Sequence, residues 1–230
     1  KGNVLSSFGM GAYEQKYGVC NTAIHRATLH DVLLQNLENI PIHTNKKITN
    51  FEQKNGIVYL SFEDGTVHET SMLIGADGVH SNVRKNLFSD TKERHARQIC
   101  WRGVLSTKLP ETSILREIWG TGQRFGYVQI SDKEVYWFAC ANIKKSIEEH
   151  AETDLSALFA NFSPLVQQLI AQTPQSAILT NEIVDLVPIQ NFYSGAVCLM
   201  GDAAHATTPN MGQGACQSIE SAWVLAECLH

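Results

Sequence analysis

The segment GDAAHATTPNMGQG, residues 201–214, places an acid, a proline and glycines between an apolar run and a helical pattern. A strand, a glycine-rich turn and a helix in succession present backbone N–H groups to a negatively charged or electron-rich ligand. The segment lacks the Lys-Ser/Thr ending of a phosphate-binding P-loop and the spacing of a first dinucleotide fingerprint. It therefore predicts a binding loop for another kind of ligand, with Asp202 as its only acid.

The segment LIGADGVHSNVRKNL, residues 73–87, repeats this order of apolar strand, glycine, acid and helix. Its glycines allow a tight turn and a close approach of the backbone to a ligand, and Asp77 is the polar group between them. Ser81 is placed to cap the helix that follows. Arg84 on that helix would pair either with a phosphate or with a buried acid.

The elements before the middle of the chain follow from the spacing of apolar residues. Residues 22–37 predict an amphipathic helix from about Thr28, ended by Pro41. Three strand-like segments follow, joined by turn signals at residues 54–56 and 64–65. They predict a β-meander whose last strand ends in the apolar run 72–74 and leads into the segment that contains Asp77.

The second half of the chain predicts a sheet, helices and a final strand–helix unit. Four runs between residues 100 and 142, separated by Gly and Asp turns, predict an antiparallel sheet. Residues 146–162 and 163–173 look helical, and residues 177–189 look extended. The strand 197–200 precedes the loop of Asp202, and a long helix follows that loop.

Composition excludes several classes of protein. The 230 residues suffice for one large domain or two small ones, and a formal net charge of −5 without a basic block argues against a nucleic-acid partner. No apolar run is long enough for a transmembrane segment, and the start does not resemble a signal peptide. The absence of a CxxC pair argues against zinc, so we expect reduced, buried thiols in a cytoplasmic protein, at Cys20, Cys100, Cys140, Cys198, Cys216 and Cys228.

Several segments together resemble one family. GADGVHSNVR and GDAAHATTPNMGQGACQSIESA are similar to the second and third cofactor motifs of single-component flavin-dependent aromatic hydroxylases, the para-hydroxybenzoate hydroxylase-like family. IHRATLHDVL resembles its arginine-bearing helix, and WGTGQRFGYVQISDKEVYWFA resembles its substrate-domain sheet. The match is most similar to the branch of salicylate hydroxylase, urate hydroxylase and zeaxanthin epoxidase. It implies a mixed α/β fold in which an incomplete, Rossmann-like FAD-binding domain accompanies an antiparallel-sheet substrate domain.

The resemblance also implies a domain division. Residues 1–98 and 191–230 would belong to the FAD-binding domain, and residues 99–190 would form the substrate domain. The first family motif, GxGxxG, is absent, and both ends of the sequence look cut, so we expect the chain to be a piece of a longer protein. We further expect the strands 72–74 and 197–200 each to lack a neighbour, and the chain alone to bind FAD poorly and to self-associate.

The activity that the resemblance implies is that of an FAD-dependent monooxygenase. NADH or NADPH reduces FAD, O2 adds at flavin C4a, and the hydroperoxide transfers one oxygen atom to an aromatic or hydrophobic small molecule. The sequence leaves the substrate and the choice of nicotinamide open. Two alternatives also stay open: a related flavoprotein oxidoreductase that does not hydroxylate, and a fragment that does not bind FAD by itself.

The resemblance assigns roles to the third motif. Asp202 would bind the ribityl chain of FAD, while the proline and glycines would let the backbone lie against the isoalloxazine ring. A helix from about Gly212 would direct its N-terminus at the N1–O2 edge of the flavin, where the reduced ring carries negative charge. The predicted cofactor-binding residues are Arg26, Asp77, Gly78, Asp202, Pro209, Gly212, Gln213 and Gly214.

The predicted substrate residues lie on the middle sheet. Arg102 would anchor an anion, and aromatic side chains would form the walls of a pocket, although ordinary sheet packing is the simpler interpretation. His205 is expected to be structural, and Ser221 stands where the family usually has an acid. No catalytic side chain and no metal ligand is predicted, and the predicted substrate residues are Arg102, Phe125, Tyr127 and Trp137.

Overall fold

The computed structural model describes residues 2–143 and 153–230. The chain divides into two compact units, which are treated separately. The first unit comprises residues 1–40, 101–139 and 154–179, and the second comprises residues 41–100, 140–153 and 180–230. The mixed α/β class with antiparallel sheets, predicted from the sequence, is confirmed. The predicted domain boundaries at residues 98 and 190 stay a prediction.

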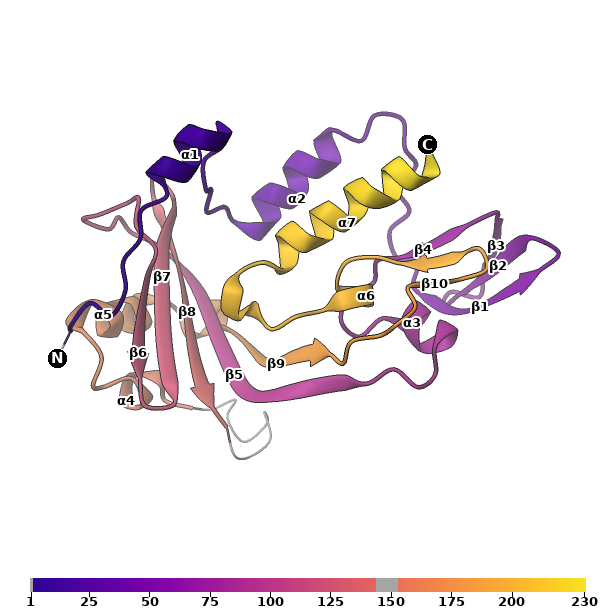
Figure 1. Ribbon diagram of the computed structural model, residues 1–230. Helices are drawn as coiled ribbons and strands as arrows, with labels where there is room; N and C mark the ends of the chain where they lie inside the picture. The colour runs from indigo at the N-terminus through magenta and orange to yellow at the C-terminus, as the bar shows by residue number, and fades with distance from the viewer. Residues whose placement is uncertain (1, 144–152) are drawn as a thin grey trace. The chain divides into compact units, whose positions relative to one another are not determined.

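An antiparallel three-stranded sheet opens the second unit (Figure 1). Asn55 and Gly56 form the first turn with φ of 52° and 77°, the left-handed conformation that the predicted hairpin requires. The apolar face of the middle strand is buried, with Val58 at 0 % and Leu60 at 6 % exposure. The strands are β1 (Ile48–Lys54), β2 (Ile57–Phe62) and β3 (Val67–Thr70), in the order β1-β2-β3.

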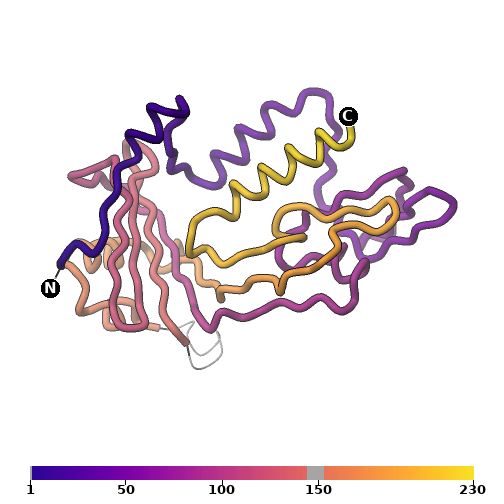
Figure 2. Tube along the Cα trace, viewed as in Figure 1, coloured from indigo at the N-terminus to yellow at the C-terminus, as the bar shows by residue number. Residues whose placement is uncertain are grey.

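The fourth strand leaves this meander, which corrects the prediction. Strand β4 (Leu73–Gly75) pairs in parallel with β11 (Val197–Leu199), and β10 (Tyr193–Ser194) lies on the other side of β11. The prediction that the two apolar strands each lack a neighbour is therefore wrong for β11, which has one on each side, whereas β4 lies at an edge of this three-stranded sheet. The pair buries Leu73, Val197 and Leu199 in one hydrophobic cluster. The tube in Figure 2 shows the trace of β11 beside that of β4.

A helix follows each of these two parallel strands. The first, α3 (Asn82–Leu87), begins after the loop that contains Asp77. After β11 the chain forms the short α6 (Asp202–His205), the 3-10 turn η3 (Pro209–Met211) and the long α7 (Gly214–Leu229). Helix α7 begins two residues later than the predicted Gly212, because Gly212 adopts a left-handed φ of 63° that closes η3 instead.

The predicted four-run sheet of residues 100–142 is present and gains a fifth strand. Strand β6 pairs antiparallel with β7, and the sheet has the order β6-β7-β8-β5-β9. The long first strand begins at Glu93, seven residues before the predicted start, and the extended run after residue 177 supplies the fifth strand. The strands are β5 (Glu93–Ser106), β6 (Arg116–Gly120), β7 (Gln123–Ser131), β8 (Glu134–Asn142) and β9 (Leu179–Leu186).

The helices of the first unit agree with the predictions only in part. Helix α2 (Arg26–Gln35) begins at Arg26 rather than Thr28, because the side chain of His25 accepts a hydrogen bond from the Ala27 N–H and caps the helix. Helix α1 was not predicted. Residues 146–152 of the helix predicted over 146–162 lie outside the described residues, and the rest of that prediction yields only α4. The four helical segments not yet given are α1 (Gly11–Tyr17), α4 (Leu155–Leu158), α5 (Pro164–Gln172) and η2 (Gln175–Ala177).

The cysteines are only partly as predicted. All six are free thiols, and Cys100 and Cys140 are buried. Cys20, Cys216 and Cys228 are exposed, so the expectation of buried thiols is wrong for these three. Their segments bury little, and α7 in particular has no fully buried residue among those that the structure describes. Across the described ranges, no helix has the length and apolar character needed to cross a membrane.

Candidate functional site

The two loops predicted from the sequence leave the same sheet edge. Gly75 at the end of β4 lies opposite Leu199 at the end of β11, so both strands run in the same direction and stop at the same level. Asp77 comes two residues after β4, and Asp202 comes three residues after β11. In open sheets of parallel strands, ligands bind outside the carboxyl ends of the strands. The structure therefore brings both acidic loops to the edge where a ligand is expected.

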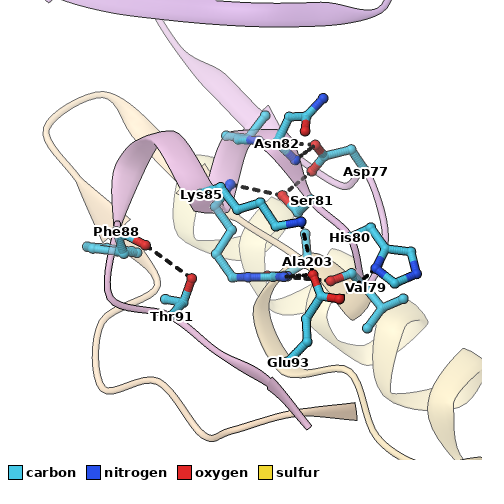
Figure 3. Close-up of polar contacts among 12 residues, drawn as sticks. Asp77, Val79, His80, Ser81, Asn82, Lys85, Phe88, Thr91, Glu93 and Ala203 are labelled. Carbon is cyan, nitrogen blue, oxygen red and sulfur yellow. Dashed lines mark hydrogen bonds and ion pairs between the residues drawn. The ribbon is translucent and has the colours of Figure 1, made fainter. Parts of the chain in front are cut away.

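The carboxylate of Asp77 is engaged within its own loop (Figure 3). It accepts hydrogen bonds from the Ser81 hydroxyl at 2.5 Å, the Asn82 N–H at 2.7 Å and the Val83 N–H at 3.1 Å. Ser81 in turn accepts a hydrogen bond from the Arg84 N–H at 2.9 Å, which confirms the predicted cap. Asp77 thus stabilises the start of α3, and its predicted contact with FAD stays a prediction.

The side chain of Arg84 joins the two loops. It is 1 % exposed, and its Nη1 donates to the Ala203 carbonyl oxygen at 3.0 Å. Its Nη2 donates to the Val79 carbonyl oxygen at 2.5 Å and lies 3.5 Å from Glu93 Oε1. Of the two alternatives predicted for Arg84, the structure shows the pair with an acid. Because Val79 follows β4 and Ala203 follows β11, one buried guanidinium fixes the spacing of both loops.

Glu93 is the acid at the centre of this cluster (Figure 3). Its Oε2 lies 2.7 Å from His80 Nδ1, and its Oε1 accepts a hydrogen bond from Lys85 Nζ at 3.0 Å. Burial alone raises the pKa of Glu93, but the hydrogen bonds from Lys85 and His80 outweigh burial and lower the pKa overall. Burial also lowers the pKa of Arg84, although a guanidinium stays charged at any physiological pH.

Asp202 differs from Asp77 in having no partner among the residues that the structure describes. Its side chain is exposed at the start of α6, after Gly201 with a φ of 59°. Within residues 2–143 and 153–230, its carboxylate makes no hydrogen bond or ion pair. A free acid at the end of a buried strand is available to the hydroxyl groups of a ligand.

The glycines of the third motif serve two different purposes. Gly212 takes a left-handed φ of 63°, and its N–H donates to the Pro209 carbonyl oxygen at 3.0 Å, so the turn itself favours glycine. Gly214 has no such conformation, and a Cβ there would meet no atom within 4 Å. Gln213, the residue before α7, provides no side-chain cap. The chain therefore leaves the backbone at Gly214 and the first N–H groups of α7 open to a flat or negatively charged ligand.

His205 has a structural contact, as expected from the sequence. Its Nε2 lies 2.6 Å from the hydroxyl oxygen of Ser221 on α7. Gly78, the second glycine of the Asp77 loop, has a φ of 83° with open space around its Cα, and Pro209 begins the turn η3. The third motif and the Asp77 loop thus lie on one unit, whereas Arg26 belongs to the other. The cofactor contact of Arg26 stays a prediction.

The residues predicted to bind substrate lie in the first unit, and two of them pack against each other in its core. The rings of Phe125 and Trp137 stack with centroids 5.4 Å apart, and Trp137 Nε1 donates to Thr173 Oγ1 at 2.9 Å. Tyr127 is 7 % exposed, and burial raises the pKa of its hydroxyl. Arg102 is half-buried. These contacts favour the packing interpretation, and a role of the four residues in substrate binding stays a prediction.

The sequence did not identify Glu93. It predicted an acid near Arg84, but Glu93 lies in the strand that follows the helix, where no turn signal or periodicity distinguishes it.

We predict that Arg84→Met destabilises the protein by about 3 kcal/mol, because it leaves the Val79 and Ala203 carbonyls without a buried donor and Glu93 without its buried cation. The matched control is Lys85→Met, which removes an exposed cation from the same acid and should cost at most about 1 kcal/mol. Urea unfolding measures both. Equal losses in the two variants would contradict the role assigned to Arg84.

We also predict an acid-sensitive contribution from Glu93. Because its folded pKa is lowered, its stabilisation is complete above its unfolded pKa, about 4.3, and is lost as pH falls through the lower folded pKa. The stability difference between the parent and Glu93→Gln should therefore be largest near pH 7 and shrink below about pH 4. Denaturant unfolding at a series of pH values measures this. The control is Glu63→Gln, which removes an exposed pair with Lys47, and a pH-independent Glu93→Gln difference would refute the prediction.

Comparison with known proteins agrees with this geometry. Residues 18–230 match the protein family described as FAD binding domain. The chain is 37% identical over 232 residues to aurachin C monooxygenase/isomerase of Stigmatella aurantiaca, covering 100% of this chain and 61% of that protein. It is 33% identical over 209 residues to 2-heptyl-3-hydroxy-4(1H)-quinolone synthase of Pseudomonas aeruginosa, covering 89% and 55% respectively. The chain thus spans less than two thirds of the length of these relatives.

Solved structures show the same relationship. HpxO of Klebsiella pneumoniae, in complex with FAD and uric acid, superposes with a TM-score of 0.85 at 29% identity, over 95% of this chain and 58% of that chain. A salicylate hydroxylase substrate complex, at 22% identity and a TM-score of 0.71, shares the fold. Two motif loops leave a single sheet edge, and the chain that carries them matches one family over most of its length. Other relatives are named as an FAD-dependent urate hydroxylase and a 6-hydroxynicotinate 3-monooxygenase. This chain belongs to the FAD binding domain family, whose model matches residues 18–230.

Proposed function

We propose that this chain binds FAD at the Asp202 loop and serves an FAD-dependent monooxygenase. The observation that carries the proposal is the contrast between the two loops. The Asp77 carboxylate accepts hydrogen bonds at the start of its own helix. Within the described residues, the Asp202 carboxylate has no hydrogen-bond partner, and no atom fills the space beside Gly214. A buried strand that ends in an unpaired acid, followed by a glycine that the chain itself does not require, is suited to a ligand.

The free groups of this loop fit FAD. The Asp202 carboxylate would accept hydrogen bonds from ribityl hydroxyls. The backbone at Gly214 would lie against the isoalloxazine ring, where a Cβ would otherwise occupy the space. The N-terminus of the 16-residue helix α7 would stabilise negative charge on the reduced ring. FAD supplies the redox and oxygen chemistry when bound, and these residues hold and orient it.

The electron donor is part of the same proposal. We infer NADH or NADPH, and O2 as the second substrate, from the activity of the relatives named as monooxygenases. The proposed localisation is cytoplasmic.

The relatives also favour a class of substrate. The chain is 33% identical to a protein named as a quinolone synthase and 30% identical to a urate hydroxylase of Klebsiella oxytoca. Both names refer to nitrogen-containing fused-ring compounds, which are electron-rich and therefore suited to accept an oxygen atom from an electrophile. We propose that the substrate is a fused nitrogen heteroaromatic compound, and that a 2-alkyl-4-quinolone is a better substrate than a purine.

We predict that Asp202→Asn weakens FAD binding by about 1–3 kcal/mol, roughly fivefold to 150-fold, because charged hydrogen bonds to the ligand are lost. Its unfolding free energy without FAD should stay unchanged, since the carboxylate has no partner within the described chain. Asp77→Asn should do the reverse and lower the unfolding free energy by about 1 kcal/mol through the weakened start of α3.

Flavin fluorescence titration and urea unfolding together test this pair. An Asp202→Asn variant with parental FAD affinity would remove the main support for the proposal.

We predict that the flavin-loaded protein consumes NADH or NADPH faster with 2-heptyl-4(1H)-quinolone than with urate, and releases a product heavier by one oxygen atom. Nicotinamide absorbance and mass spectrometry of the product measure this. Reduction of the flavin without any oxygenated product from either compound would favour the alternative, a flavoprotein oxidoreductase that does not hydroxylate. A protein that takes up no FAD would favour the other alternative, a chain that does not bind FAD by itself.

A further inference from the structure

Helix α7 faces the rest of its unit with a narrow and mostly polar stripe. Every fully described residue of the helix is at least partly exposed, and those that are only partly exposed are Gly214, Ser218, Ser221 and Leu225. Their spacing of four, three and four residues places them on one face of the helix. The large apolar side chains Ile219, Trp223, Val224 and Leu229 are between 52% and 70% exposed and do not take part in this face.

The N-terminal half of this stripe lies against the turn that follows β11. A Cβ on Gly201 would lie 3.0 Å from the Ser218 hydroxyl oxygen, so the backbone of the turn and the helix approach closely. One helical turn further, His205 Nε2 lies 2.6 Å from Ser221 Oγ. Small side chains bury little apolar surface, so hydrogen bonds contribute much of what holds this half of the helix in place.

The direction of the hydrogen bond between His205 and Ser221 follows from the other bond that Ser221 makes. The hydroxyl hydrogen of Ser221 is donated to the Gln217 carbonyl oxygen at 2.9 Å. Ser221 Oγ therefore accepts from His205, and the His205 Nε2 carries the proton. The Gln217 N–H donates to the carbonyl oxygen of Gln213, the residue that precedes α7. Hydrogen bonds to Ser221 and Gln217 thus connect the last residue of α6 with Gln213, immediately before α7.

We propose that His205 and Ser221 are positioning residues that hold the N-terminus of α7 in place and thereby set the reduction potential of the bound flavin. The proposal rests on the proposed function, in which that N-terminus faces the flavin. A helix N-terminus stabilises negative charge only over the first turn, so a small displacement of α7 weakens its effect on the reduced ring.

The chain offers a matched pair of serines to test this. Ser218 and Ser221 both donate to the carbonyl oxygen four residues earlier, at 2.9 Å in each case, but only Ser221 also accepts a bond from His205. Ser218→Ala and Ser221→Ala therefore each remove an equivalent hydrogen bond within the helix, and only Ser221→Ala also breaks the contact with His205. Ser221→Thr keeps the hydroxyl and serves as the rescue variant.

The first measurement is hydrogen exchange in the FAD-free protein. We expect Ser221→Ala and His205→Ala to raise the exchange rate of the amides in the first half of α7 by about fivefold, the factor that corresponds to one hydrogen bond. Ser218→Ala and Ser221→Thr should remain close to the parent. The double variant His205→Ala/Ser221→Ala should exchange no faster than Ser221→Ala, because both changes break one contact. Equal exchange in the two serine-to-alanine variants would overturn the proposal.

The second measurement is the flavin reduction potential of the FAD-loaded protein, which a purely structural contact would not alter. We expect a more negative potential in Ser221→Ala and a parental potential in Ser218→Ala and Ser221→Thr. Faster exchange without a change in potential would overturn the proposed effect on the flavin. If the parent takes up no FAD, the proposed function fails, and the exchange measurement alone decides whether His205 and Ser221 hold α7.

Discussion

A single buried guanidinium sets the geometry on which the site depends. Arg84 donates to carbonyl groups in both motif loops, and it can remain buried only while both oxygens and Glu93 are in place. The cost of burying an unpaired charge is large, so the two loops hold each other at a fixed spacing. The paired strands β4 and β11 bring the loops to one edge of the sheet, and Arg84 then determines how the loops lie there.

Two loops of similar sequence have different local chemistry. In the first, the acid satisfies the N–H groups at the start of α3, and the loop is complete without a ligand. In the second, Asp202 does not cap a helix in this way, because α6 is only one turn long. The long helix α7 begins twelve residues later. The likeness between GADG and GDAA therefore does not extend to the use of their acids, and only the three-dimensional contacts distinguish them.

The sequence predicted features that depend on local chemistry. The Asn55-Gly56 turn, the Ser81 cap and the apolar runs of β4 and β11 follow from residue type and short spacing, and all are present. It was wrong about the neighbour of β4, because strand pairing across more than 120 residues leaves no periodic signal in either strand. The role of Glu93 was not predicted for the same reason, since its partners become neighbours only after β5 folds back toward α3.

The open space at Gly214 has a consequence for experimental design. Where a glycine is required by its own backbone, as at Gly212, substitution disturbs folding and ligand binding together, and the two effects cannot be separated. At Gly214 the chain would accommodate a methyl group, and the helix would gain intrinsic propensity from it. An alanine at this position therefore offers a folded reference protein in which only the space next to the backbone has been filled. Crystals, calorimetry and spectra of such a protein would provide a reference with which the flavin-dependent signals of the parent can be compared.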